Sequence, residues 1–288
     1  MMKKPWKVLT YIILGIQAVI TIYPLAWMII GSLKDNISFL ADPWALPDKL
    51  RLYNYQVAWE EGIQNYMVNS ILITVVTVCF VILLSCTFSF MLARFPFKGS
   101  GILIGLFFAG MMIPVHCTLI PLYNMMNMAG LIDHLWALLF PYVASSLPIA
   151  VFLTYGHYQQ LPKELEEAAR IDGCSVTGMF FRVFLPLSKP ALATVAMFYG
   201  VNRWNSYFWA MQLLQDDKKA PLQVMLKKML VDRVANAADA ALVTAESMSS
   251  PTTIIYAVII IAIIPMLIVF PFVQKYFKTG LTVGGVKG

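Results

Sequence analysis

Long apolar runs alternate with short polar segments along this chain of 288 residues. A helix that crosses a bilayer needs about 20 predominantly apolar residues, and its backbone must satisfy its own hydrogen bonds because no water is available. Six runs are long enough, and they predict six transmembrane helices, over Val8–Leu33, Asn69–Ala93, Gly101–Tyr123, Leu135–Tyr155, Pro190–Leu214 and Thr253–Val273. The expected fold is an all-α integral membrane protein, with residues 1–288 forming a single transmembrane domain.

Composition supports a bilayer as the solvent. Hydrophobic residues make up 59% of the chain and charged residues 12%. Soluble globular proteins have about 45–50% apolar and about 25% charged residues. A chain this apolar lacks the polar groups needed to cover its surface in water. The net charge of +6 comes without a basic stripe interleaved with aromatic residues, so no nucleic-acid partner is expected.

The lysines and arginines predict which segments face the cytoplasm, where positive charge accumulates. Residues 34–68 and 215–252 contain at least as many acidic as basic residues, and residues 124–134 contain no lysine or arginine. We therefore expect residues 34–68 and 215–252 to be outward loops, and both termini and residues 156–189 to be cytoplasmic. The basic residues on the cytoplasmic side are Lys3, Lys4, Lys7, Arg94, Lys98, Lys163, Arg170, Arg182, Lys189, Lys275, Lys278 and Lys287.

The cytoplasmic segment 156–189 has the signals of two short helices joined by a turn. Pro162 suits a first helical turn, and the glutamates that follow it complement the helix dipole. Gly173 suits the left-handed residue after a helix C-terminus. Ser175 suits the N-cap of a second helix, which Pro186 is expected to end. An ordered helix with alanines outside the bilayer indicates a surface where another protein docks.

The same segment carries a motif of known spacing. Glu167-Ala168-Ala169 is followed after three residues by Gly173, and after nine more by Val183-Phe184-Leu185-Pro186. This pattern resembles the EAA signature of permease subunits of bacterial ABC importers, with Val183 in place of the usual Ile. Asp172 before the glycine, the pair Trp204-Asn205 and the glycine-rich C-terminus resemble the carbohydrate-uptake branch, in particular its maltose-permease-like partner subunit.

The resemblance implies a permease subunit that forms half of the translocation pathway of a sugar or oligosaccharide importer. It implies three kinds of partner besides membrane lipid: a second homologous permease, two ATP-binding subunits and an extracytoplasmic solute-binding protein. The location implied is the bacterial cytoplasmic (inner) membrane. The residues that would couple to the ATPase are Glu167, Ala168, Ala169, Asp172, Gly173, Leu185 and Pro186. The tail residues that would reach the ATPase are Gly284, Gly285, Lys287 and Gly288.

We expect this chain to be no enzyme. It contains no G-x-x-x-x-G-K-[ST] phosphate loop. ATP and Mg²⁺ are therefore expected on partner subunits, with no cofactor in this chain. The three histidines are scattered, none pairs with a carboxylate at ligand spacing, and no two of the four cysteines have metal-ligand spacing, so no metal site is predicted.

Arg203 is the one basic residue inside a predicted span. A charge in the membrane is costly and tends to face a bundle interior or a water-filled path. Because a guanidinium pairs well with carboxylates, Arg203, Trp204 and Asn205 are candidates to line the substrate pathway, and an acidic oligosaccharide is the hypothetical cargo. Arg203 would otherwise pair with a partner subunit or extend to an interface.

An ion-coupled secondary transporter is the main alternative. It predicts ionisable residues within the spans and inverted repeats. The six runs contain almost no ionisable residue besides Arg203, and no repeat is visible. A membrane scaffold without transport activity would leave the motif in residues 167–186 unexplained.

Overall fold

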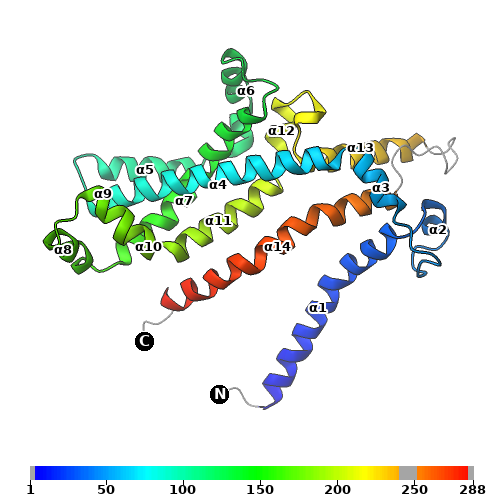
Figure 1. Ribbon diagram of the computed structural model, residues 1–288, viewed down its shortest axis with the longest axis horizontal. Coiled ribbons are helices and arrows are strands. Elements are labelled where there is room, and N and C mark those ends of the chain that lie inside the picture. Colours follow the sequence, from blue (N-terminus) through cyan, green and yellow to red (C-terminus); the bar gives the residue numbers. More distant parts are fainter. Residues whose placement is uncertain (1–3, 240–251, 285–288) are drawn as a thin grey trace. The chain divides into compact units, whose positions relative to one another are not determined.

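The computed structural model describes residues 4–239 and 252–284, and within these ranges all regular structure is helical (Figure 1). The elements are α1 (Lys4–Ser32), α2 (Asn36–Ala41), α3 (Tyr53–Glu60), α4 (Ile63–Arg94), α5 (Ser100–Met111), η1 (Val115–Thr118), α6 (Leu119–Met128), η2 (Leu135–Leu138), α7 (Leu139–Gln160), α8 (Glu164–Ile171), α9 (Val176–Met179), η3 (Phe180–Phe184), α10 (Leu185–Leu187), α11 (Lys189–Trp204), α12 (Phe208–Leu213), η4 (Asp217–Lys219), α13 (Leu222–Asp239) and α14 (Thr252–Gly284).

Four helices are long and apolar enough to cross a membrane, namely Trp6–Ser32, Ile63–Arg94, Leu135–Gln160 and Thr252–Phe272. Two further apolar runs are pairs of helices with a sharp bend between them. Ser100–Met111 and Val115–Met128 meet at 99°, and Val176–Leu187 and Lys189–Trp204 meet at 71°. The described chain thus has four to six candidate spans, which agrees with an all-α membrane protein.

The third and fifth runs, each predicted as one span, are broken in the structure. Pro114 lies between α5 and η1 and has an extended ψ of 127°. Proline has no N–H and disfavours a helical backbone at the residue before it, so α5 does not continue through this position. In the fifth run α11 ends at Trp204, and a helix resumes only at Phe208. Asn205 and Ser206 lie in the break, and side chains of these types compete with the helical backbone for hydrogen bonds.

The predicted outward loops contain helices of their own. Residues 34–68 hold α2 and α3, and α4 begins at Ile63, six residues before the predicted Asn69. Residues 215–252 hold η4 and α13, with residues 240–251 outside the described ranges. By its internal contacts the chain divides into two compact units, residues 1–64 with 225–265 and residues 65–224 with 266–288.

In the first unit, aromatic rings join α1, α2 and α14. The Tyr256 ring lies 5.5 Å from the rings of both Trp27 and Phe39. A Cβ on Gly31 would lie 2.8 Å from Cδ2 of Tyr256, so only glycine permits this approach of α1 to α14. Buried Asn54 adds a polar connection, because its amide donates to the carbonyl oxygens of Ser32 and Lys34 at 2.7 Å each.

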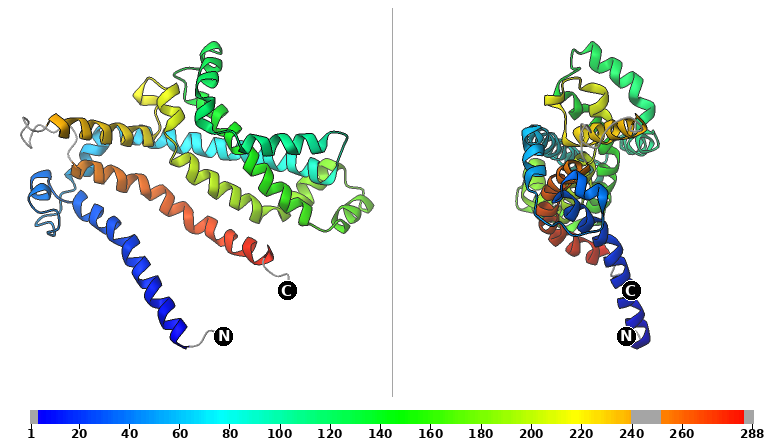
Figure 2. Two further views of the ribbon diagram at one scale, coloured as in Figure 1. Left: turned by 180° about the vertical axis from the view of Figure 1, so that it is seen from behind. Right: turned by 90° about the vertical axis from the view of Figure 1, so that its right-hand side faces the viewer.

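In the second unit, α7 packs against α5 and α11, and a buried polar contact joins α7 to α4. The Ser89 hydroxyl lies 2.6 Å from the Thr154 hydroxyl and donates to the carbonyl oxygen of Val151 at 3.1 Å. Val81, Ala150 and Val195 form an apolar cluster beside this contact. Helices α8–α10 lie at one end of α4 and α7, and α6 and α12 lie toward the other end (Figures 1 and 2).

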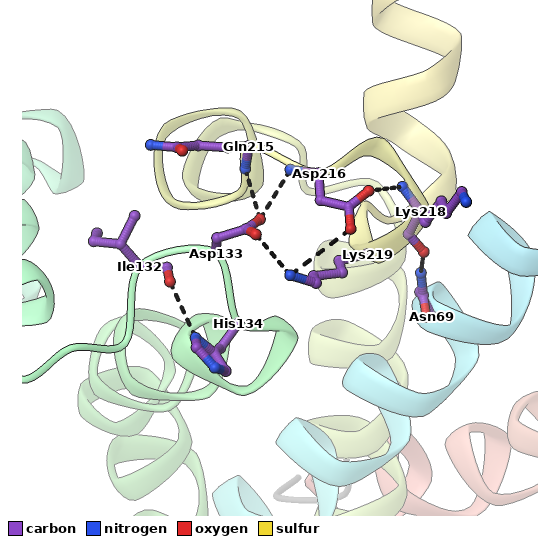
Figure 3. A network of polar contacts seen from close by, with 8 residues as sticks. All are labelled: Asn69, Ile132, Asp133, His134, Gln215, Asp216, Lys218 and Lys219. Carbon is purple, nitrogen blue, oxygen red and sulfur yellow. Dashed lines mark hydrogen bonds and ion pairs between the residues drawn. The ribbon is translucent and has the colours of Figure 1, made fainter.

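An acidic residue fastens the chain at the α6–α12 end (Figure 3). Asp133 has φ 63°, and its Oδ1 accepts the backbone N–H groups of Gln215 at 3.0 Å and Asp216 at 2.9 Å. Its Oδ2 lies 2.6 Å from Nζ of Lys219. The Asn69 amide donates to the carbonyl oxygens of Lys218 at 2.8 Å and Ala220 at 3.1 Å. We call these contacts the Asp133 clasp; they hold residues 215–220 against α4.

Two glycines on α1 provide a matched stability test. Gly31→Val should destabilise the protein by about 1–3 kcal/mol, the usual cost of overpacking, because Tyr256 is held by two other rings and cannot move freely. Gly15→Val should leave stability nearly unchanged, because no atom lies within 4 Å of a Cβ at that position. Thermal unfolding of the purified protein in detergent measures the difference. Equal melting temperatures for the two variants would contradict the packing described.

The Asp133 clasp should persist under mild acid. The Lys219 ammonium, followed by the two backbone N–H groups, holds the pKa of the Asp133 carboxyl well below its ordinary value. A native pKa that is lowered stabilises the fold fully above the unfolded value of about 3.9, and the contribution is lost as pH falls toward the native pKa. Hydrogen exchange of residues 215–220 should therefore show the same protection at pH 7 and pH 5, after correction for the intrinsic exchange rates.

Asp133→Asn tests the charge in the clasp separately from the backbone conformation. Asparagine also tolerates positive φ and keeps an acceptor oxygen, but it loses the ion pair to Lys219. Residues 215–220 should lose protection in this variant. Asp232→Asn, on an exposed position of α13, is the control and should show wild-type exchange.

Candidate functional site

The segment between α7 and α11 begins with a short helix that is strongly polarised in charge. Its first turn contains Glu164, Glu166 and Glu167, and its last turn contains Arg170, an arrangement that complements the helix dipole. Arg170 also pairs with Glu166 one turn earlier, at 2.6 Å. Helix α8 therefore forms from local interactions, which explains how eight residues are helical outside the main bundle.

Gly173 ends this helix. It has φ 71°, its N–H donates to the carbonyl oxygen of Arg170 at 3.0 Å, and the N–H of Cys174 donates to that of Ala169 at 2.9 Å. A left-handed residue after a helix satisfies carbonyl groups that the last turn leaves without partners. No atom lies within 4 Å of a Cβ at Gly173, so its backbone conformation, and not crowding, favours glycine.

The second arm of the segment starts at the predicted cap. The Ser175 side chain accepts the N–H of Gly178 at 3.1 Å, and α9, η3 and α10 follow without a gap. Pro186 does not end this arm, contrary to prediction. It occupies the first turn of α10, where the N–H that proline is missing is not needed, and the helix runs to Leu187. The bend comes at Ser188, whose hydroxyl donates to the carbonyl oxygen of Phe184 at 2.7 Å.

The motif residues divide between an exposed face and a buried face. Ala169 is buried at 5% exposure, against Phe90, Met179 and Phe180. Ile171 is 86% exposed, an unusual value for a large apolar side chain. Leu185 is half-buried, and the other motif residues are exposed: Glu167, Ala168, Asp172, Gly173 and Pro186. The exposed face of α8 thus presents acidic, small and apolar groups together.

An arginine that the motif does not include holds this segment to the bundle. Arg94, the last residue of α4, donates from Nη2 to the carbonyl oxygens of Tyr158 and Leu161 at the end of α7. Its guanidinium carbon lies 5.0 Å from the centre of the Phe184 ring. From the sequence, Arg94 was interpreted only as one of the positive charges that mark the cytoplasmic side. A basic residue closing a span directly before Phe95-Pro96 was the available signal for a structural role.

Arg203 lies near the other end of α11. Its guanidinium carbon is 4.7 Å from the centre of the buried Tyr142 ring, and Nη2 donates to Oδ1 of Asn202 at 2.7 Å. Its Nε is buried without a hydrogen-bond partner. Among the described residues no carboxylate lies within ion-pair distance of Arg203. The side chain is a partly desolvated cation held by a π face and one amide oxygen.

The remaining predicted site residues differ from this arginine in exposure or lie outside the described ranges. Trp204 is 4% exposed, so its ring faces the interior of the second unit, and Asn205 is exposed. Gly284 is the last residue of α14, and Gly285, Lys287 and Gly288 lie beyond the described residues. Within the described ranges no group of three histidine, cysteine or acidic side chains is arranged to hold a metal ion.

Comparison with known proteins gives relatives over nearly the whole chain. The arabinooligosaccharides transport system permease protein AraQ of Halalkalibacterium halodurans is 33% identical over 276 residues, which cover 94% of this chain and 93% of the relative. The polygalacturonan/rhamnogalacturonan transport system permease protein YtcP of Bacillus subtilis is 39% identical over 170 residues, 59% of each chain.

A solved structure has the same fold. The crystal structure of a bacterial ABC transporter involved in the import of the acidic polysaccharide alginate contains a chain that superimposes with a TM-score of 0.81 and 27% identity, over 96% of this chain and 99% of that one. Residues 85–283, which include the motif segment and Arg203, match the family model described as binding-protein-dependent transport system inner membrane component. The chain therefore belongs to this family of ABC transporter permeases.

Proposed function

We propose that this chain is a transmembrane permease subunit of an ATP-driven importer of sugars or oligosaccharides, and that α8 couples it to a separate ATPase subunit. The observation that carries the proposal is the geometry of the motif segment. Ala169 fixes α8 to the bundle while Glu167, Ala168 and Ile171 remain exposed on it. An 86% exposed isoleucine beside acidic and small residues fits a cleft on a partner protein better than it fits solvent.

The proposed assembly has this chain as half of the pathway. Its partners are a second homologous permease subunit, two ATP-binding subunits that hold ATP and Mg²⁺, and an extracytoplasmic solute-binding protein. In the proposed topology six spans cross the bacterial cytoplasmic membrane as one transmembrane permease domain with both termini inside. Residues 34–68 and 215–252 then face outward, and Gly284, Gly285, Lys287 and Gly288 approach the ATPase.

The transport functions of the relatives support a sugar as the cargo, and Arg203 supports an acidic one. The alginate transporter imports an acidic polysaccharide, and polygalacturonan is a polymer of an acidic sugar. A buried guanidinium is costly without an anionic partner, and its planar donors fit a carboxylate. Arg203 is only partly buried and the neighbouring Asn205 is exposed, so the two side chains offer donors to a carboxylate and a hydroxyl. We propose that Arg203 contacts the carboxylate of a passing uronate.

An ion-coupled transporter gains no support from the structure. The ion pairs among the described residues join Asp35 to Arg51, Glu166 to Arg170, and Lys219 to Asp133 and Asp216. All of them lie outside the four long apolar helices. No ion pair among the described residues therefore lies within these four helices, whereas ion-coupled transporters place interacting ionisable groups inside their spans.

The turn after α8 can be tested through the conformation of Gly173. Gly173→Val should reduce ATP-driven uptake by about 5- to 30-fold, because a non-glycine residue at positive φ costs about 1–2 kcal/mol and shifts α8 out of place. Gly173→Asn, which tolerates the same backbone conformation, should retain most uptake. The measurement is uptake by the complex of permeases, ATPase and binding protein in proteoliposomes. Wild-type uptake with Gly173→Val would contradict the role given to α8.

The charge of the cargo can be tested at Arg203. Arg203→Gln should lower kcat/KM for an oligogalacturonide by roughly 10- to 100-fold, the value of a hydrogen bond to a charged group. The carboxyl-reduced form of the same oligosaccharide is the matched neutral substrate, and its uptake should change little. If both substrates lose uptake equally, Arg203 pairs with a partner subunit or supports the fold. If neither changes, Arg203 does not contact the cargo.

A further inference from the structure

The end of α7, from which α8–α10 depart, is joined to α4 by one side chain; we call α8–α10 the coupling segment. The last carbonyl groups of a helix have no partner within it and carry the negative end of its dipole. At the end of α7 the carbonyl oxygens of Tyr158 and of the C-cap residue Leu161 both accept from Nη2 of Arg94, and that of Tyr158 also accepts from the N–H of Leu161. Arg94 thereby fixes the end of α4 to the residues from which the segment leaves the bundle.

The same guanidinium also reaches the returning arm of the segment. It lies 5.0 Å from the ring of Phe184, a fully buried residue of η3. The Phe184 ring packs 5.1 Å from Phe90 on α4 and 6.1 Å from Tyr158 on α7. Arg94 therefore contacts both the end of α7 and the returning arm, and the Phe184 ring that it faces packs on rings of α4 and α7.

A second arginine continues the connection to α8. The guanidinium carbon of Arg170 lies 5.8 Å from the ring of Phe95, the residue next to Arg94. Phe95 in turn packs edge-on against Phe90, with ring centres 5.5 Å apart. Ala169 is buried in the same cluster. The ends of α4, α7 and α8 therefore meet in one cluster. Two arginines face aromatic rings of this cluster, and Ala169 of α8 is buried in it.

The π-helical turn places two rings of the cluster. In η3 the N–H of Leu185 bonds to the carbonyl oxygen of Phe180, one residue farther back than in an α-helix. Both Phe180 and Phe184 are buried there, and their ring centres lie 5.2 Å and 5.1 Å from that of Phe90. Isolated π-turns are rare and occur often at functional sites. Here the wide turn lets both rings face α4.

We propose that Arg94 is the positioning residue that joins the coupling segment to the transmembrane helices, so that a displacement of α8 moves the ends of α4 and α7 with it. This role rests on the proposed function, since it presupposes that α8 docks on an ATPase. Lysine is not expected to replace Arg94, because an ammonium lacks the flat guanidinium that faces the Phe184 ring while one of its nitrogens, Nη2, donates to both carbonyls. Lys98 has the same charge four residues later but is fully exposed.

The test compares variants in the complete transporter, reconstituted in proteoliposomes with its second permease, its ATPase and its binding protein. Sugar uptake and ATP hydrolysis are measured together. Arg94→Lys and Arg94→Gln should lower the uptake per ATP hydrolysed by at least about fivefold, the lower range of a typical coupling free energy, while ATP hydrolysis continues. Lys98→Gln should keep the wild-type ratio. Arg170→Gln, at an exposed position, should lower the ratio less than the Arg94 variants.

The ratio separates coupling from folding. A residue that only supports the fold would reduce the yield of assembled complex, but the complexes recovered would keep the wild-type uptake per ATP. That result for Arg94→Lys, or a ratio unchanged in both Arg94→Gln and Arg170→Gln, would overturn the proposal. Failure of the proposed function looks different, because the wild-type complex itself would then show no ATP-driven sugar uptake.

Discussion

The structure depends first on the need to satisfy backbone hydrogen bonds where water is absent. Helices meet this need within one segment, and each departure from a helix requires a local substitute. The substitutes are visible at the breaks. The Asp133 carboxylate binds two backbone N–H groups near the end of α12, and Arg94 binds two carbonyl oxygens at the end of α7. Charged groups therefore stand where the chain leaves regular helix.

The two ends of the second unit are built differently, and the difference fits their proposed tasks. The Asp133 clasp is a set of polar contacts among loop segments on a partly exposed surface. The α8–α10 end is a cluster of aromatic rings with two arginines stacked on it. Interlocked rings transmit displacement because a packed interior yields little. A surface held by polar contacts adapts more easily to a partner or a cargo.

Arg203 shows how a cation is retained inside an apolar chain. A Tyr142 ring and the Asn202 amide offset part of its desolvation, yet Nε has no partner. Such an arginine is stabilised further by any anion that approaches it. Arg203 also stands beside a break, like Asp133 and Arg94, because α11 ends at Trp204 and the backbone groups at a helix end are polar.

The sequence by itself determined the membrane class, the approximate positions of the apolar runs and the motif segment, because these depend on composition and on short-range signals such as Gly173 and Ser175. It did not reveal the 99° angle near Pro114, the 71° angle at Ser188 or the end of α11 at Trp204, since hydropathy is blind to backbone direction. Only the tertiary structure decided that Ala169 is buried while Ile171 is exposed. It alone gave Arg94 its partners, because these carbonyls lie 64 and 67 residues away along the chain and meet Arg94 only when α4 packs against α7.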